Sequence, residues 1–196
     1  MELYCIRHGE SESNAKKTLT GWAPSPLTAR GREQAKSTGM LIRHIRFDSV
    51  IASDLVRARQ TAELAFPGHD IQTDARIREY GMGSLEGCTN EHCIKEYGAV
   101  FYTNEFAAFG GESPEMVSAR VADFMGEMEQ KEAGPYRGAK IAVVGHAGSI
   151  LHILCYALDC TIREDKIPID NTSITKIRCE NGAWTLCLFH YNGTIK

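Results

Sequence analysis

Short apolar runs alternate with longer stretches of helical periodicity along this chain. Apolar runs of about four to eight residues are typical of buried strands, whereas amphipathic helices repeat their apolar positions about every three or four residues. The pattern predicts strands at 3–6, 49–52 and 141–145 and helices at 28–43, 54–66 and 149–158. Strands separated by helices are typical of a parallel sheet with helices on both faces. We therefore expect an α/β fold built as a three-layer α/β/α sandwich.

Capping signals locate the starts of two helices. Thr28 follows a proline-containing turn and is a suitable N-cap for the helix at 28–43. Ser113 followed by Pro114 is typical of an N-cap with proline at the first helical position, and it predicts a further helix that runs to about Lys131.

The C-terminal part of the chain has strand-like alternation instead of helical periodicity. Apolar and polar residues alternate at 173–179 and again at 184–189, on either side of the sequence Glu-Asn-Gly-Ala at 180–183. Two alternating runs around such a turn are typical of a β-hairpin. We therefore expect a mostly parallel sheet with an antiparallel edge strand.

The length and composition indicate one domain over residues 1–196. A chain of 196 residues that is 43% hydrophobic is long enough for one well-formed core. The stretch 87–111 contains glycine, asparagine and aromatic residues without clear periodicity. It could cover a site, or it could be an ordinary connecting loop and helix, so a lid within about 87–135 is a hypothesis.

Charge and cysteine usage narrow the range of partners and compartments. A net charge of −3 without a basic excess predicts no nucleic-acid or membrane partner and favours a small molecule. No apolar run approaches the ~20 residues that span a bilayer, and no secretion signal is recognisable, so we expect a cytoplasmic protein. The seven cysteines are odd in number and form no CxxC motif, which favours reduced core thiols.

Residues that suit phosphate chemistry follow the predicted strands. Arg7 and His8 follow the first strand, Arg57 lies shortly after the second, and His146 comes directly after the third. Ligands of parallel sheets bind beyond the carboxyl ends of the strands, so we expect these side chains to form one cationic pocket. The helices that begin beside the second and third strands would add backbone N–H donors for an anion.

Each of these residues has a purely structural alternative. Arg57 and Arg59 share one predicted helix, where an arginine commonly lies on a solvated face or pairs with a carboxylate such as Glu63. His146 could be a core histidine with a hydrogen-bonded ring. The occurrence of these residues at equivalent strand ends favours a functional interpretation.

Two further alternatives concern a carboxylate and a metal. Glu79 lies between candidate ion-pair partners, Arg76 and Arg78. The chain contains no HxxxH, HxH or Asp-rich cluster, and arginines beside a site oppose cation binding. We therefore expect no metal and no cofactor.

Seven sequence blocks spread over the chain resemble the histidine phosphatase superfamily, the phosphoglycerate mutase-like proteins. They are RHGESESN at 7–14, TGWAPSPLTARGREQA at 20–35, SDLVRARQTAE at 53–63, IREYGMGSLEG at 77–87, GGESPEMVSARV at 110–121, VVGHAGSI at 143–150 and NTSIT at 171–175. The resemblance implies a phosphoglycerate mutase-like sandwich and a phosphoryl-transfer site.

The resemblance also implies catalytic roles for five residues. His8 matches the nucleophile that becomes phosphohistidine, and Glu79 matches the proton donor. Arg7, Arg57 and His146 match the phosphate pocket. Because positive neighbours disfavour a protonated imidazole, we expect the arginines to lower the pKa of His8. Glu79 would protonate the leaving alkoxide and then take a proton from the attacking water.

Substrate binding is expected to involve the same pocket and a few further positions. Asn14 matches a polar residue that contacts phosphoryl oxygens, and the backbone at Thr20 and Gly21 matches a segment that approaches them. Ala147 completes the expected substrate-binding set, together with Arg7, Arg57, Glu79 and His146. Glu10, Arg59 and Ser149 are expected to support these residues.

The resemblance favours a phosphomonoesterase that acts on a small phosphorylated metabolite. The family's mutases are typically longer, with a larger insertion and a C-terminal tail that closes over the site, so a phosphoglycerate mutase is the alternative. A non-catalytic phosphate-binding regulatory module is an alternative of another class, which the presence of His8 and Glu79 disfavours. A homodimer is left open.

The substrate itself is not predicted by these motifs. α-Ribazole phosphatases, sugar bisphosphatases and broad-specificity acid phosphatases share them. Met82 and Leu85 stand where phenylalanine and tryptophan are common in the family. Aromatic residues could stack on a substrate or pack a cover, and the candidates are Trp22, Tyr97, Phe101, Tyr102, Phe106 and Phe109.

Overall fold

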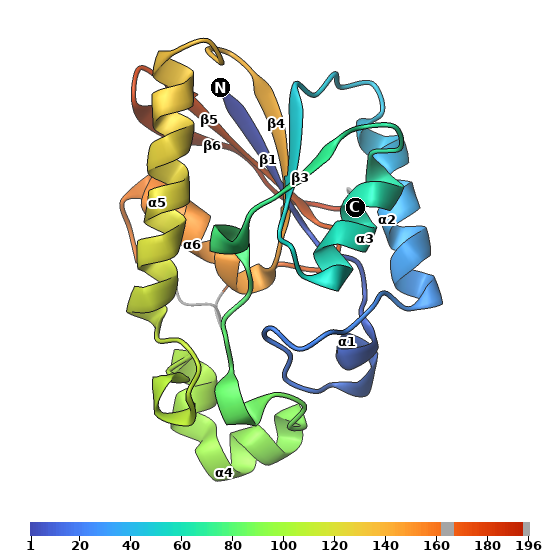
Figure 1. Cartoon of the computed structure of the whole chain (residues 1–196), viewed down its shortest axis with the longest axis vertical. Coiled ribbons are helices and arrows are strands. Elements are labelled where there is room, and N and C mark those ends of the chain that lie inside the picture. The colour runs from blue at the N-terminus through green and yellow to red at the C-terminus, as the bar shows by residue number, and fades with distance from the viewer. Residues whose placement is uncertain (162–166, 194–196) are drawn as a thin grey trace.

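The computed structural model describes residues 1–161 and 167–193, in which six strands form one sheet of order β3-β2-β4-β1-β5-β6 (Figure 1). The strands are β1 (Glu2–Arg7), β2 (Ser49–Ala52), β3 (Ile71–Thr73), β4 (Lys140–Gly145), β5 (Ile174–Glu180) and β6 (Ala183–Tyr191). Four of them, β3, β2, β4 and β1, pair in parallel, whereas β5 is antiparallel to β1 and β6 is antiparallel to β5. The mixed sheet is therefore confirmed, and its antiparallel part is the predicted C-terminal hairpin.

Helices cover both faces of this sheet, which confirms the three-layer sandwich. Figure 1 shows α2 (Ala29–Ile42) and α3 (Val56–Ala65) on one side, with α5 (Pro114–Ala133) and α6 (Ala147–Leu158) on the other. Alternate residues of a strand point to opposite faces. Accordingly, Leu3 and Cys5 of β1 lie in the core under α5 and α6, while Tyr4 and Ile6 lie in the core under α2 and α3.

The predicted caps explain where these helices begin. The Thr28 hydroxyl accepts a hydrogen bond from the Gly31 N–H, and the Ser113 hydroxyl accepts one from the Met116 N–H. The helix predicted at 149–158 begins two residues earlier, at Ala147, because His146 is its N-cap and Ser149 closes the first turn by a hydrogen bond to the His146 N–H. Capping thus brings the start of α6 directly to the end of β4.

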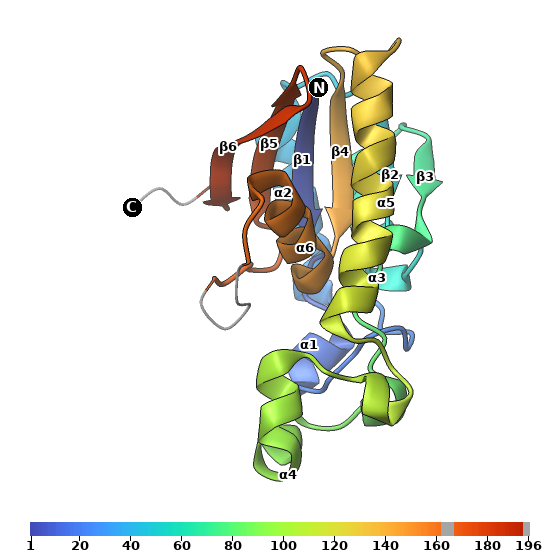
Figure 2. The ribbon, with the colours of Figure 1, turned by 90° about the vertical axis from the view of Figure 1, so that its left-hand side faces the viewer.

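Smaller elements lie beyond the carboxyl ends of the parallel strands. Figures 1 and 2 show α1 (Glu12–Lys16) and α4 (Asn90–Thr103) beyond the end where β1 and β4 stop. The 87–111 stretch therefore contains a helix, capped by Thr89. Its periodicity is interrupted because Tyr97 has non-helical backbone angles (φ −134°, ψ 36°), which kink α4. Two short 3₁₀ helices, η2 (Gly83–Leu85) and η3 (Ala107–Phe109), complete this region, and a third, η1 (Ala75–Ile77), packs against α5.

The cysteines and the helix lengths bear on two expectations from composition. All seven cysteines are free thiols, but only Cys5, Cys93 and Cys179 are buried, so the expected core placement is wrong for the exposed Cys160 and Cys187. In the described part of the chain, the helices are too short or too polar to cross a bilayer.

Candidate active site

His8 lies at the carboxyl end of β1, at the centre of the sheet. Its backbone N–H donates to the Gly145 carbonyl at the end of β4 (3.0 Å), which continues the pairing of the two strands. Its Nδ1 lies 2.7 Å from the Gly9 carbonyl oxygen, and its Nε2 lies 3.2 Å from Nε of Arg57. A carbonyl can only accept, so these bonds assign the proton to Nδ1 and the lone pair to Nε2.

The environment of His8 keeps its ring uncharged. Burial, followed by the charges of Arg57 and Arg7, holds the pKa of His8 well below its ordinary value of 6.5. The expected influence of the arginines is confirmed, and burial is the larger cause. Nε2 is therefore unprotonated at neutral pH, which is the state that a nucleophile requires.

Arg57 enters the site from the first turn of α3. It is only 2% exposed, and its Nη2 donates to the carbonyls of Gly21 (2.9 Å) and Thr20 (3.3 Å). Its Nη1 has no hydrogen-bond partner in residues 1–161 and 167–193, and burial lowers its pKa to about 10. A solvated-face role is therefore wrong for Arg57, although it holds for Arg59, which lies 3.8 Å from Glu63.

The loop that holds Arg57 is itself held by a carboxylate that sequence reasoning missed. The two oxygens of Glu86 accept hydrogen bonds from the N–H groups of Gly21 (2.9 Å) and Trp22 (2.7 Å). A side chain on Gly21 would place its Cβ 2.1 Å from the Tyr80 carbonyl oxygen, so only glycine fits. The only signal for Glu86 was its place in the IREYGMGSLEG block.

His146 lies behind His8, away from solvent. It is 0% exposed, its ring centroid is 5.1 Å from that of His8, and it is not among the residues that line the cavity. Its ring nitrogens have no hydrogen-bond partner among the described residues, so the alternative of a core histidine with a hydrogen-bonded ring is wrong. Burial, followed by the charge of Arg57, holds the pKa of His146 well below 6.5.

Two asparagines complete the side of the site next to His8. The Asn14 Oδ1 accepts hydrogen bonds from the Ser11 N–H (3.1 Å) and from Nδ2 of Asn171 (3.3 Å), so the group of Asn14 that remains for a ligand is its N–H donor. Asn171 also donates to the His8 carbonyl (2.8 Å). No role was predicted for Asn171, although it opens the NTSIT block. Arg7 donates to the Ile169 carbonyl and lines the same cavity.

Glu79 faces His8 from an irregular segment after η1. Its two carboxylate oxygens accept hydrogen bonds from the N–H groups of Tyr80 (3.0 Å) and Gly148 (3.3 Å). The proposed ion pairs with neighbouring arginines are wrong, because Arg76 binds Asp74, Asp123 and Glu127, and Arg78 binds Asp54.

Most of these side chains line one cavity of about 400 Å³. Of the predicted site residues, its lining includes Arg7, His8, Asn14, Thr20, Arg57, Glu79 and Ala147, whereas Gly21 and His146 are not part of the lining. The lining also includes amide and aromatic side chains from α4, which lies beyond the sheet (Figure 1), and from the segment after it, Asn90, Tyr102, Asn104 and Phe106. The structure thus brings most of the predicted site together, and it adds Asn90 and Asn104, for which the sequence contained no signal.

The aromatic candidates separate into two groups. Tyr102 and Phe106 line the cavity. Tyr97 and Phe109 pack against each other with ring centroids 5.2 Å apart, and the Trp22 ring packs against the guanidinium of Arg78 (5.0 Å). Those three lie outside the cavity lining, and the side chain of Phe101 lies outside the described part of the structure.

The donor set of the site is that of an anion pocket. Within residues 1–161 and 167–193, no three His, Cys, Asp or Glu side chains come together in a group that could hold a metal ion. The N–H groups of Arg7 and Arg57 are donors, which suit phosphate oxygens. The arrangement can therefore bind a phosphoryl group between a nucleophilic imidazole and a carboxyl group.

Comparison with known proteins gives consistent matches over nearly the whole chain. The family model of the histidine phosphatase superfamily (branch 1) matches residues 3–192. A curated relative from Salmonella paratyphi A, named "Probable phosphoglycerate mutase GpmB", is 30% identical over 192 residues, which cover 94% of this chain and 87% of the relative.

Solved structures share the fold. A "putative alpha-ribazole-5'-P phosphatase" from Escherichia coli str. K-12 superposes with a TM-score of 0.86 at 26% identity, covering 98% of each chain. A mycobacterial glucosyl-3-phosphoglycerate phosphatase in complex with VO3 superposes with a TM-score of 0.84 at 25% identity, covering 96% of this chain and 98% of that one.

Proposed function

This chain belongs to the histidine phosphatase superfamily, and on that premise we propose that it is a phosphomonoesterase that forms a phosphohistidine on His8. The observation that carries this proposal is the state of His8. Its Nε2 is unprotonated and lies 3.2 Å from Nε of Arg57, and His8 lines the same cavity as Glu79. A nucleophile, a cationic pocket and a carboxyl group around one small space are the requirements of phosphoryl transfer to histidine.

The first step transfers the phosphoryl group to the enzyme. Arg7, Arg57 and the amide N–H of Asn14 bind the phosphate oxygens, and Nε2 of His8 attacks phosphorus opposite the leaving oxygen. The N–P bond forms as the P–O bond breaks, and the cations stabilise the charge on the equatorial oxygens. Glu79, in its acid form, gives its proton to the leaving alkoxide.

The second step returns the enzyme to its starting state. Glu79 is now a carboxylate and accepts a proton from a water molecule, whose oxygen attacks the phosphohistidine. The N–P bond breaks, inorganic phosphate leaves, and His8 and the protonated Glu79 are regenerated. One carboxyl group therefore serves as acid and then as base.

We expect the substrate to be a small phosphorylated metabolite whose alcohol part meets the cavity lining that comes from α4 and the segment after it. Asn90 and Asn104 supply amide groups for hydroxyls, and Tyr102 and Phe106 supply aromatic faces. The similar structures named for α-ribazole-5′-P and glucosyl-3-phosphoglycerate support a phosphatase. A phosphoglycerate mutase is the second candidate, and it would return the phosphoryl group to another hydroxyl. The observation in its favour is the relative that is named as a phosphoglycerate mutase.

The test compares the wild-type protein with His8→Ala on a panel of phosphorylated metabolites with EDTA present. We expect the wild type to release inorganic phosphate and to yield an acid-labile phosphoenzyme, and His8→Ala to keep its circular dichroism spectrum and do neither. An acid-labile phosphoenzyme in His8→Ala would overturn the assignment of the nucleophile. Full inhibition by EDTA that added metal reverses would contradict metal independence.

The same panel separates the alternatives. Conversion of 3-phosphoglycerate in the presence of its 2,3-bisphosphate, with little release of phosphate, would identify a mutase. Binding of vanadate without turnover of any ester, including an aryl phosphate, would identify a non-catalytic phosphate-binding module.

A further inference from the structure

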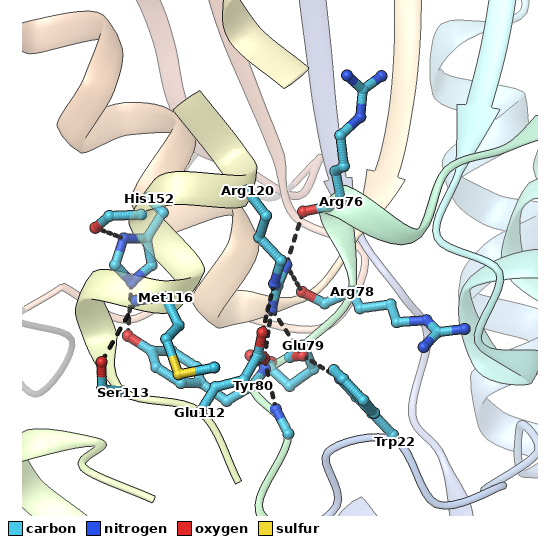
Figure 3. Close-up of polar contacts among 12 residues, drawn as sticks. Trp22, Arg76, Arg78, Glu79, Tyr80, Glu112, Ser113, Met116, Arg120 and His152 are labelled. Carbon is cyan, nitrogen blue, oxygen red and sulfur yellow. Dashed lines mark hydrogen bonds and ion pairs between the residues drawn. The ribbon is translucent and has the colours of Figure 1, made fainter. Parts of the chain in front are cut away.

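Arg120 contacts the segment that carries Glu79, although none of the roles described so far uses it. Figure 3 shows this side chain reaching from α5 to the backbone of the segment. Its Nη1 donates to the carbonyls of Arg76 (2.7 Å) and Arg78 (2.8 Å), and its Nη2 donates to the carbonyl of Glu79 (3.0 Å). One guanidinium group thus binds three carbonyls within four residues.

Glu112 holds the other side of the same segment. Its two oxygens accept hydrogen bonds from Nε and Nη2 of Arg120, both at 2.9 Å, and Oε2 also accepts from the Gly81 N–H (2.8 Å). The Glu112 N–H donates back to the Gly81 carbonyl (2.7 Å). The two members of one partly buried ion pair therefore bind the backbone at Glu79 and at Gly81.

The segment needs such contacts because it has no regular secondary structure. Residues 78–82 belong to no helix or strand, so no ladder or helical turn orients their peptide groups. A general acid must stand within hydrogen-bond reach of the leaving oxygen, and an error of about 1 Å can cost ~10²-fold in rate. The contacts of Arg120 and Glu112 bear directly on this requirement.

We propose that Arg120 and Glu112 are a positioning pair that holds the carboxyl group of Glu79 at the leaving oxygen of the substrate. The inference rests on the proposed function, because it gives Glu79 the role of the acid. Neither residue lines the cavity, so both act through the backbone of Glu79 and Gly81 and not on the substrate.

The pairing also explains why an arginine is tolerated at this place. A guanidinium taken out of water without a carboxylate partner would be destabilising. Glu112, which is 7% exposed, lies against Arg120 and neutralises it while leaving its remaining N–H groups free to bind carbonyls. The pair therefore supplies geometry without a net charge.

The experiment uses leaving groups that depend differently on an acid. p-Nitrophenol leaves without much protonation, whereas the alcohol of glycerol 2-phosphate needs a proton, and kcat/KM reports the step that forms the phosphoenzyme. For Glu79→Gln we expect kcat/KM to fall ~10²–10⁴-fold with glycerol 2-phosphate and far less with p-nitrophenyl phosphate. For Arg120→Lys, which keeps the charge but loses the planar fork, we expect the same selectivity with a loss of ~10²-fold.

Arg76→Gln is the matched control. The Arg76 side chain also joins the chain just before the irregular segment to α5, through Asp123 and Glu127, but it points away from Glu79 (Figure 3). We expect it to leave both kcat/KM values close to those of the wild type. If Arg120→Lys does not fold, Glu112→Gln tests the same pair, since its amide oxygen can still accept one hydrogen bond.

The outcomes separate the inference from the function on which it rests. Equal losses with both esters in Arg120→Lys or Glu112→Gln, while Glu79→Gln is selective, would reduce the pair to a structural role and overturn the inference. A Glu79→Gln variant without selectivity would instead overturn the role of Glu79 itself.

Discussion

His8 and Glu79 face the same cavity, but the chain holds them there by different means. His8 extends a central strand, and its backbone N–H continues the pairing of β1 with β4. Glu79 belongs to an irregular segment whose carbonyls are bound by the side chains of Arg120 and Trp22. The proposed nucleophile is thus positioned by the sheet, and the proposed acid by side chains from distant parts of the chain. We call the surroundings of His8 the nucleophile half of the site and those of Glu79 the acid half.

The nucleophile half and the acid half of the site also differ in the charged groups that they contain. Around His8, burial and two arginines keep the imidazoles neutral, so the positive charge there belongs to the arginines. Around Glu79, the one nearby arginine of α5 is neutralised by Glu112. Because of this difference, we expect substitutions around His8 to impair the hydrolysis of all phosphate esters alike. Substitutions around Glu79 should impair esters with poor leaving groups most.

The largest effect is expected from Arg57→Gln, which removes a cation from the nucleophile half. We expect kcat/KM to fall ~10³–10⁵-fold, and by the same factor for p-nitrophenyl phosphate and glycerol 2-phosphate, because the charge on the phosphoryl oxygens is common to both. Arg59→Gln, whose guanidinium is 3.8 Å from Glu63, is the surface control and should retain activity. A loss confined to glycerol 2-phosphate would contradict the expectation that groups around His8 act on all phosphate esters alike.

A smaller effect is expected where the two halves meet, at Gly148. A Cβ at this position would lie 2.2 Å from Oε1 of Glu79 and 2.7 Å from the Tyr80 ring, so Gly148→Ala should displace the carboxyl group together with the ring beside it. We expect a loss of ~10²-fold in kcat/KM for glycerol 2-phosphate and little loss for p-nitrophenyl phosphate. Gly126→Ala in α5, where nothing lies within 4 Å of the new Cβ, is the matched control. Equal losses with both esters would show that His8, and not Glu79, is the group disturbed.

The smallest effect concerns the pH dependence of folding. The folded protein holds the pKa of His8 and of His146 below 6.5, so the unfolded chain binds more protons below that pH, and the free energy of unfolding falls as the pH falls. Each group contributes a slope of about 1.4 kcal/mol per pH unit between pH 6.5 and its folded pKa. Urea denaturation at pH 7, 6 and 5 measures it.

His146→Asn should remove one such contribution, so the slope in this variant should be smaller than in the wild type. An unchanged slope in His146→Asn would contradict the neutral, buried state that distinguishes the nucleophile half.

Sequence reasoning located the two halves unequally. Arg7, His8 and His146 were predicted because parallel strands end at one edge of a sheet, and a strand is recognisable from a few apolar residues. Glu79 was assigned only through the resemblance, since no periodicity marks an irregular segment. Arg120 and Glu112 received no role, because their function depends on side-chain contacts to backbone groups far away in the chain.

The alternation of apolar runs and helical stretches was sufficient to predict the sandwich, its hairpin edge and the strand ends that border the cavity, because burial patterns and caps are local properties. Only the tertiary structure decided which of two neighbouring arginines is buried. Arg57 binds the site and Arg59 faces solvent, although both lie on α3. The tautomer of His8 and the contacts around Glu79 were likewise decided only by the tertiary structure. These depend on partners from distant segments, which no local pattern encodes.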